Sequence, residues 1–156
     1  MQKLMEEEYI KQIRFIVPGE PFGKERPKFA RVGSYTKTYT PKRTVQHEKE
    51  IATIFKEVAK GQMFKKNMPL DIRIVAYYPI PKSTSKKKRK EMLEYRIRPV
   101  VKPDLDNVAK LVYDALNGVA WHDDNSIVDT QVRKFYSDNP RVDVSIRVVE
   151  TDMIKN

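Results

Sequence analysis

The feature that most constrains the fold of this chain is an amphipathic helix expected over residues 106–117. From residue 105 to 116 the apolar side chains recur every three or four positions, which is the spacing of a single helix face. Asn117-Gly118 directly follows this run and is a typical helix stop. The segment therefore predicts a helix that packs one side against a hydrophobic core.

Two further helices are expected elsewhere in the chain. Residues 45–60 carry apolar side chains at helical spacing, and Thr44 is the predicted N-cap of this helix. A short basic helix is expected from Ser85 to about Tyr95.

Strand-like runs of β-branched or alternating apolar residues occupy four segments: 13–17, 70–78, 127–136 and 142–149. The turn sequence SDNP separates the last two runs, which predicts an antiparallel hairpin. The expected fold class is α+β (mixed α/β), a single small domain with an approximately four-stranded mixed sheet and two main helices.

A length of 156 residues predicts one domain over 1–156, with flexible tails at 1–12 and 151–156 and a mobile basic loop at 82–90. No apolar run of 18 residues is present, and the N-terminus lacks the pattern of a signal peptide, so no membrane partner is expected. The absence of cysteine excludes disulfides and thiolate zinc sites. A cytoplasmic protein is the simplest interpretation.

The formal net charge is +10, which favours a polyanionic partner such as nucleic acid. Basic side chains concentrate in residues 24–43, interleaved with Phe29, Tyr35 and Tyr39, and again in residues 82–102. Both blocks are typical of phosphate-contacting surfaces. A merely solvated or disordered basic loop has the same composition, so both interpretations remain open.

Carboxylates concentrate around the helix expected over residues 106–117. Asp104 and Asp106 lie one residue apart at its start, where an extended backbone points both side chains to the same side. Asp123 and Asp124 follow the helix, and we expect the chain to return them to the same end. Carboxylates 4 Å apart repel by about 4 kcal/mol per pair at an effective dielectric of 20, so a fold that gathers them needs a cation.

Oxygen ligands without cysteine favour a hard ion, Mg²⁺ or Mn²⁺, shared with a phosphate of the substrate. Such an ion polarises the scissile phosphate and ionises a water. Lys110, one turn after Asp106, would add a fixed positive charge near the phosphate.

Purely structural explanations exist for each part of this pattern. An aspartate at a helix start caps free amides, and Asp106 with Lys110 is also a common surface pair. Asp123, Asp124 and Asn125 also fit a polar turn. His122 leaves a zinc site or a general base open, although a single histidine supports either one weakly.

The ordered string of these residues resembles the signature of the RusA family of Holliday junction resolvases. The family pattern is D-L-D-N-x-x-K, then D-A-L, then W-x-D-D and a further Asp. Here it reads DLDNVAK from residue 104, DAL from residue 114 and WHDD from residue 121, with Asp129 in the last place. GKERPKF (23–29) and YTPKRT (39–44) resemble a phage- and prophage-associated branch. Some members place several arginines directly before the first Asp, whereas this chain has only Lys102 close by.

The resemblance implies a homodimeric, metal-dependent endodeoxyribonuclease without a small-molecule cofactor. It would bind four-way DNA junctions and resolve them by paired symmetric nicks during recombination or repair. Asp104, Asp106 and Asp124 would bind Mg²⁺, with Mn²⁺ as an alternative, and Lys110 would be the catalytic lysine. Asp123 and Asn107 would support them.

Basic residues near these positions are the expected DNA contacts: Lys24, Arg26, Lys28, Arg31 and Lys102. Trp121 is expected to pack in the core near the site, with stacking on a splayed base as the other possibility. A non-catalytic protein that binds junctions or single strands remains an alternative, as does a metal-dependent flap or branch nuclease.

Overall fold

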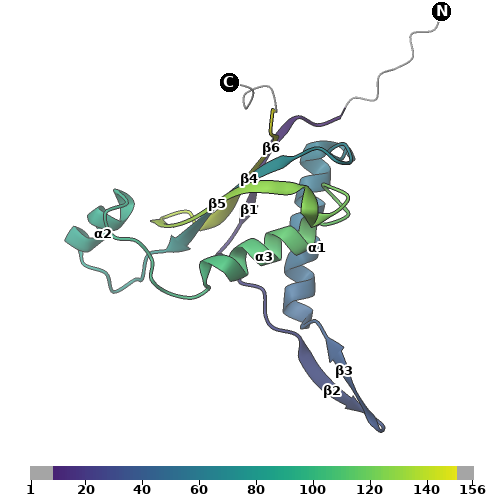
Figure 1. The fold of residues 1–156 in the computed structure, drawn as a ribbon. Helices are drawn as coiled ribbons and strands as arrows, with labels where there is room; N and C mark the ends of the chain where they lie inside the picture. The colour runs from purple at the N-terminus through teal and green to yellow at the C-terminus, as the bar shows by residue number, and fades with distance from the viewer. Residues whose placement is uncertain (1–8, 151–156) are drawn as a thin grey trace, which may run out of the picture.

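A four-stranded mixed sheet with strand order β1-β6-β4-β5 forms the body of the protein, and strands β2 and β3 form a separate two-stranded sheet (Figure 1). The computed structural model describes residues 9–150, so most of the two expected tails lies outside the described residues. The α+β class and the approximate strand count are confirmed. The elements are β1 (Gln12–Pro18), β2 (Lys28–Val32), β3 (Tyr35–Tyr39), α1 (Lys42–Ala59), β4 (Leu70–Pro79), α2 (Lys86–Leu93), α3 (Leu105–Leu116), the 3₁₀ turn Asp124–Ser126, β5 (Ile127–Ser137) and β6 (Arg141–Val148).

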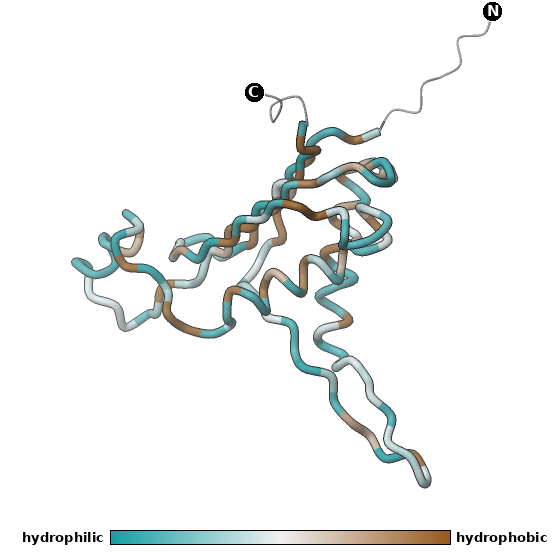
Figure 2. The backbone as a smooth tube through the Cα atoms, in the orientation of Figure 1, coloured by the Kyte–Doolittle hydropathy of each residue, from teal (hydrophilic) through white to brown (hydrophobic). Residues whose placement is uncertain are grey.

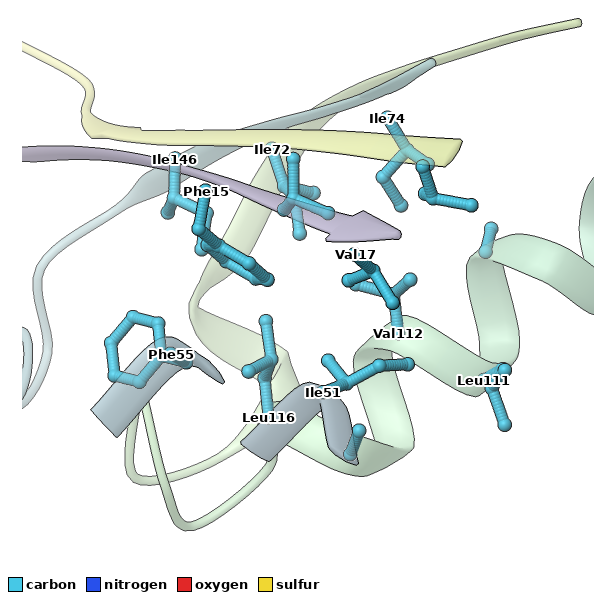
Figure 3. Packing of buried hydrophobic residues seen from close by; sticks show 14 of the residues in the cluster. Phe15, Val17, Ile51, Phe55, Ile72, Ile74, Leu111, Val112, Leu116 and Ile146 are labelled. Carbon is cyan, nitrogen blue, oxygen red and sulfur yellow. The ribbon is translucent and has the colours of Figure 1, made fainter. Parts of the chain in front are cut away.

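Helices α1 and α3 pack against one face of the large sheet (Figure 3). In β1, β6 and β4 every second residue points into this core, and the register aligns Phe15, Val144 and Ile74 across the three strands. Ile51 and Phe55 of α1 meet this face. Because the inward positions are almost all aliphatic or aromatic, burial of this face is the main source of stability.

The expected hairpin between residues 127–136 and 142–149 is wrong. Strand β5 pairs in parallel with β4, and β6 pairs antiparallel with the other edge of β4, so β4 lies between them. The strand β4 is apolar and buried enough for the centre of the sheet, whereas only one residue of β5 is buried. Residues 138–140 cross two strand spacings, about 10 Å, which is within the roughly 14 Å reach of four residues.

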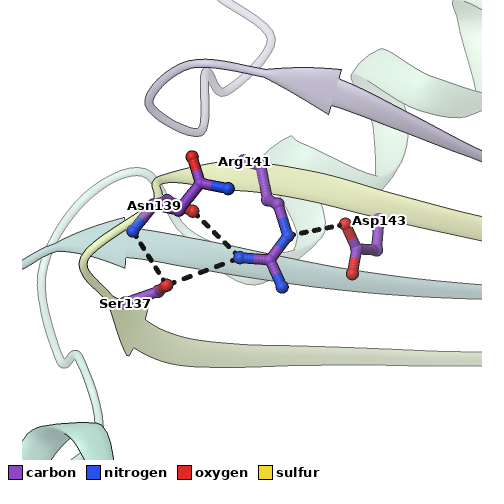
Figure 4. A network of polar contacts seen from close by, with 4 residues as sticks. All are labelled: Ser137, Asn139, Arg141 and Asp143. Atoms are coloured by element: carbon purple, nitrogen blue, oxygen red, sulfur yellow. Dashed lines mark hydrogen bonds and ion pairs between the residues drawn. The ribbon is translucent and has the colours of Figure 1, made fainter.

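A polar network around Arg141 fixes this crossing (Figure 4). The Arg141 guanidinium donates to Asp143 Oδ1 at 3.1 Å, to the Asn139 carbonyl at 3.0 Å and to Ser137 Oγ at 3.4 Å. It also lies 3.9 Å from the centre of the Tyr77 ring, on the strand that the turn passes. These contacts hold the ends of β5 and β6 on opposite sides of β4.

The predicted N-cap Thr44 is also wrong. Helix α1 begins at Lys42 with Pro41 as its N-cap, so Thr44 lies inside the first turn. Its hydroxyl is fully buried and accepts a hydrogen bond from the Glu25 amide at 3.3 Å. Thr44 therefore ties α1 to the segment before β2 and does not start the helix.

Two basic elements project from opposite sides of the body, the β2–β3 ribbon and the short helix α2 (Figure 1). Ser85 caps α2 by accepting from the Lys88 amide, which confirms the expected basic helix. The mobility expected of 82–90 stays a prediction, although the second half of that segment is helical. Helix α2 is largely hydrophilic, whereas the β2–β3 ribbon is mostly near neutral in hydropathy, with hydrophobic positions between its cations (Figure 2). Among residues 9–150, no helix has the length and apolar content needed to cross a bilayer.

Candidate active site

Asp104 and Asp106 lie at the N-terminus of α3 with their carboxylates exposed. Asp104 is the N-cap residue, yet its side chain accepts no capping hydrogen bond from the described part of the chain. Asp106 lies in the first turn, and within residues 9–150 it forms no ion pair with Lys110. Neither the helix-cap nor the surface-pair explanation accounts for these two residues. The positive end of the helix dipole makes their shared negative charge less costly.

Tyr78 fixes the backbone directly before Asp104. Its phenol lies in the core at the end of β4 and donates to the Pro103 carbonyl at 2.5 Å. Burial, together with the negative charge of Asp104, raises the pKa of Tyr78 to about 12. The phenol therefore stays protonated at neutral pH and keeps donating to this carbonyl.

Replacing Tyr78 by phenylalanine should lower the free energy of unfolding by about 1 kcal/mol at pH 8, the usual net value of one hydrogen bond. The phenol of Tyr78 is harder to ionise in the folded protein than in the unfolded chain. Its contribution to the free energy of unfolding is therefore fully present below pH 10 and is lost as pH rises toward about 12. The gap between wild type and Tyr78→Phe should therefore narrow between pH 10 and 12. Urea unfolding of both proteins at pH 8 and pH 11 measures this gap, and a constant gap would contradict the assignment.

Asp124 is oriented by the buried indole of Trp121. Trp121 is 1% exposed, and its Nε1–H donates to Asp124 Oδ1 at 2.8 Å. The expectation that Trp121 packs in the core is confirmed, and its ring is not available to stack on a base. Asp123 precedes the 3₁₀ turn and is exposed. A buried donor that locks one carboxylate oxygen is the kind of support that a functional carboxylate requires.

Asp124 nevertheless lies at the opposite end of α3 from Asp104 and Asp106. Helix α3 has 12 residues, which corresponds to about 18 Å. The hydrogen bond from the Tyr78 hydroxyl to the Pro103 carbonyl holds the start of α3 beside the C-terminal end of β4.

The chain after α3 meets the other end of β4. The Phe64 amide donates to the Ala120 carbonyl at 2.8 Å, and Ile127 pairs with Leu70. Leu70 and Tyr78 are about 26 Å apart along the strand. The expectation that the chain returns Asp123 and Asp124 to the first two aspartates is therefore wrong. Within residues 9–150, no three His, Cys, Asp or Glu side chains lie close enough together to hold a metal ion.

A groove of about 620 Å³ opens beside Asp104. Cations and polar groups of three segments line it: Lys24, Arg26, Arg43, Lys102, Asp104 and Asn107. Three of the expected DNA contacts therefore lie together next to the first aspartate, whereas Lys28 and Arg31 lie on β2 of the projecting ribbon. A groove with these cations attracts phosphate groups.

The wall of this groove depends on Gly23 and Lys24. A Cβ atom on Gly23 would lie 2.6 Å from Pro103 Cβ, so only glycine allows this close approach to the start of α3. The Lys24 amide donates to the Asn107 carbonyl at 3.0 Å. Its ammonium pairs with Asp114 and lies 3.4 Å from Glu48.

Lys24 is therefore already paired with carboxylates. Burial alone would lower the pKa of its ammonium, but the hydrogen bond and charge of Asp114, supported by Glu48, raise it above 10.5. Lys24 joins α1, α3 and the groove wall, and its direct contact with DNA stays a prediction. The other basic residues of the groove are the more available cations.

Sequence reasoning missed Tyr78 and Arg43. Tyr78 has the same parity in β4 as Ile72, Ile74 and Ala76, so the alternation placed its phenol in the core, where a tyrosine needs a hydrogen-bond acceptor. Arg43 belongs to the basic block 24–43, but only the fold shows that it faces the groove. Its guanidinium lies 5.2 Å from the centre of the Phe22 ring, which holds it there.

Comparison with known proteins defines the class of this protein as a DNA endonuclease. Residues 18–147 match the family model described as Endodeoxyribonuclease RusA. The chain is also 35% identical over 139 residues to the uncharacterized protein YqaN of Bacillus subtilis (strain 168), which covers 88% of this chain and 96% of that protein. The chain therefore belongs to the RusA family, and its membership implies nuclease activity and supports a role in resolving Holliday junctions.

Proposed function

We propose that this protein is a Mg²⁺-dependent homodimeric endonuclease that resolves four-way DNA junctions by paired symmetric nicks. The observation that carries the proposal is the pair of free carboxylates, Asp104 and Asp106, beside a groove lined by cations. The groove would bind the phosphodiester backbone, and the carboxylates would act on the phosphate that lies next to them. The basic surface and the acidic end of α3 thereby serve one reaction.

The donor set at this end of α3 fits a hard divalent cation. Both side chains offer carboxylate oxygens, which Mg²⁺ and Mn²⁺ prefer, and the carboxylate of Asp104 is not used to cap α3. A bound ion at this place would polarise the phosphate and lower the pKa of a water. Asp104, Asp106 and Asp124 are the residues that we propose to hold it.

The side chains around this pair have separate roles in the proposal. Lys110 lies one turn after Asp106 on the exposed side of α3, where its ammonium would stabilise negative charge on the attacked phosphate. Arg26, Arg43 and Lys102 would fix the strand in the groove. Asn107 would support Asp106, because its backbone is fixed by Lys24.

A homodimer would bring the three aspartates together at one site. One chain holds Asp104 and Asp106 at one end of α3 and Asp124 beyond the other end, so a single chain does not complete the set. A two-fold dimer makes every contact twice, so Asp124 of one protomer and the aspartate pair of its partner would form two equivalent sites. Two equivalent sites also match the two-fold symmetry of a four-way junction and the paired nicks.

The test uses a synthetic four-way junction, a linear duplex of matched sequence and a flap, each with and without Mg²⁺. We expect two symmetric nicks in the junction only when Mg²⁺ is present, and little cleavage of the linear duplex. Equal cleavage of the duplex would refute junction selectivity. Tight binding without any cleavage would favour the alternative of a non-catalytic junction-binding protein, and cleavage of the flap alone would favour a flap nuclease.

A further inference from the structure

The β2–β3 ribbon leaves its large side chains in solvent. Phe29, Tyr35 and Tyr39 are 74%, 63% and 46% exposed. The two strands pair only with each other, and the ribbon projects away from the body (Figure 1). A two-stranded hairpin is marginally stable by itself, so an arm with exposed aromatic rings is suited to a partner that covers them.

The pairing register divides these side chains between two faces. Tyr39 lies opposite Lys28, Lys37 opposite Ala30, and Tyr35 opposite Val32. Directly paired residues share a face, so one face carries both tyrosines with Lys37 between them. We call Tyr35, Lys37 and Tyr39 the tyrosine face. The opposite face carries Phe29 and Arg31 beside the small polar residues Thr36 and Thr38.

The charge of the ribbon selects the kind of partner. From Arg26 to His47 the chain contains no aspartate or glutamate, and the ribbon itself carries Lys28, Arg31 and Lys37. A second copy of the ribbon would bring like charges together, whereas a nucleic acid offers phosphates for the cations and bases for the rings.

The ribbon is also continuous with the groove. The segment that enters β2 supplies Gly23 to Arg26 to the groove, and Arg43 lies in the first turn of α1, which follows β3 after a short connection. A DNA strand bound in the groove beside Asp104 would therefore reach the base of the ribbon.

We propose that the β2–β3 ribbon is an arm that binds unpaired or unstacked bases, with Tyr35 and Tyr39 stacking on bases and the cations contacting the adjacent phosphates. Stacking on aromatic rings needs an exposed base face, which an intact duplex does not offer. This inference deepens the proposed function, because a branch point exposes such bases close to the cleavage site. It rests on DNA as the substrate and does not require catalysis.

The test measures binding to three DNA probes without Mg²⁺: a four-way junction, a duplex with an unpaired bulge, and an intact duplex. The junction and the bulge carry 2-aminopurine at the unpaired or branch position. Wild-type protein should quench or shift this fluorescence, and the double variant Tyr35→Ala with Tyr39→Ala should lose the signal and bind roughly 10- to 100-fold more weakly. Binding to the intact duplex should change much less.

Two matched variants separate stacking from loss of fold. Tyr35→Phe with Tyr39→Phe keeps both rings and should retain the signal, and Thr36→Ala with Thr38→Ala alters the opposite face and should behave as wild type. Unchanged bulge binding in the double alanine variant would overturn the inference. A change of oligomeric state in that variant, measured by sedimentation, would also overturn it in favour of contact between two copies.

These outcomes are independent of the proposed function. A wild-type protein that binds the bulge through its tyrosines but never cleaves a junction would sustain the arm and refute the resolvase. If the double alanine variant binds and cleaves junctions as the wild type does, the resolvase function is sustained and the role of the ribbon as a base-binding arm is refuted.

Discussion

Asp106→Asn should abolish cleavage of a four-way junction while leaving binding to that junction intact. The substitution keeps the size of the side chain but removes the negative charge that a divalent cation needs, and metal assistance contributes several kcal/mol to such reactions. We expect the rate of nicking to fall roughly 10²- to 10⁴-fold. Because Asp106 is exposed and forms no ion pair among the residues that the structure describes, the fold should tolerate the change.

Single-turnover cleavage at saturating Mg²⁺ measures this loss, and a gel-shift titration without metal measures binding. Glu57→Gln is a suitable control, since Glu57 is exposed on α1 and does not belong to the motif. Asp106→Asn protein that still cleaves at the wild-type rate would refute the assignment of the site to this end of α3. Loss of both binding and cleavage would indicate that Asp106 acts on the fold or on DNA affinity.

Much of the fold follows from the sequence because periodicity is a local property. The strand expected at 70–78 and the helix expected at 106–117 lie within one residue of β4 and α3, since both segments bury one regular face. The order of the strands in the sheet does not follow in the same way. SDNP joins β5 to β6 as a hairpin turn would, yet β4 enters between them because its own side chains are the more apolar.

The start of helix α1 at Lys42 was also not predictable from local sequence patterns. Thr44 is an ordinary N-cap by sequence, but its hydroxyl is taken by the Glu25 amide from a distant segment. Long-range contacts of this kind are not visible in local patterns.

The candidate site was likewise predictable only where its residues are close together in the sequence. The motif identified Asp104, Asp106 and Lys110 as one group, and helix α3 does hold them together at one end and along one side. Asp124 follows the far end of α3 and directly precedes β5, whose pairing with β4 begins at Leu70, so the chain does not return to the start of α3. Sequence order therefore predicts which residues matter, whereas their distribution over two ends of a helix emerges only from the fold.

That distribution leads to the second prediction, which concerns mixtures of inactive proteins. Asp106→Asn and Asp124→Asn should each be inactive as homodimers, but a mixture that has exchanged subunits should recover nicking. In a heterodimer, one composite site combines both substituted residues, whereas the other combines two intact ones. Random exchange gives heterodimers in about half of the population, each with one working site, so about a quarter of the wild-type sites should be active.

The products of such a mixture distinguish this arrangement from a site within one chain. One working site per dimer should nick a single strand, so a denaturing gel should show cleavage while a native gel shows few resolved duplexes. A mixture of Asp104→Asn with Asp106→Asn is the control and should stay inactive, because both substitutions lie at the same end of α3 and damage both composite sites. If differently tagged subunits are shown to exchange and the first mixture stays inactive, Asp124 does not complete the partner's site. The metal ligands would then have to be sought among other carboxylates near Asp104.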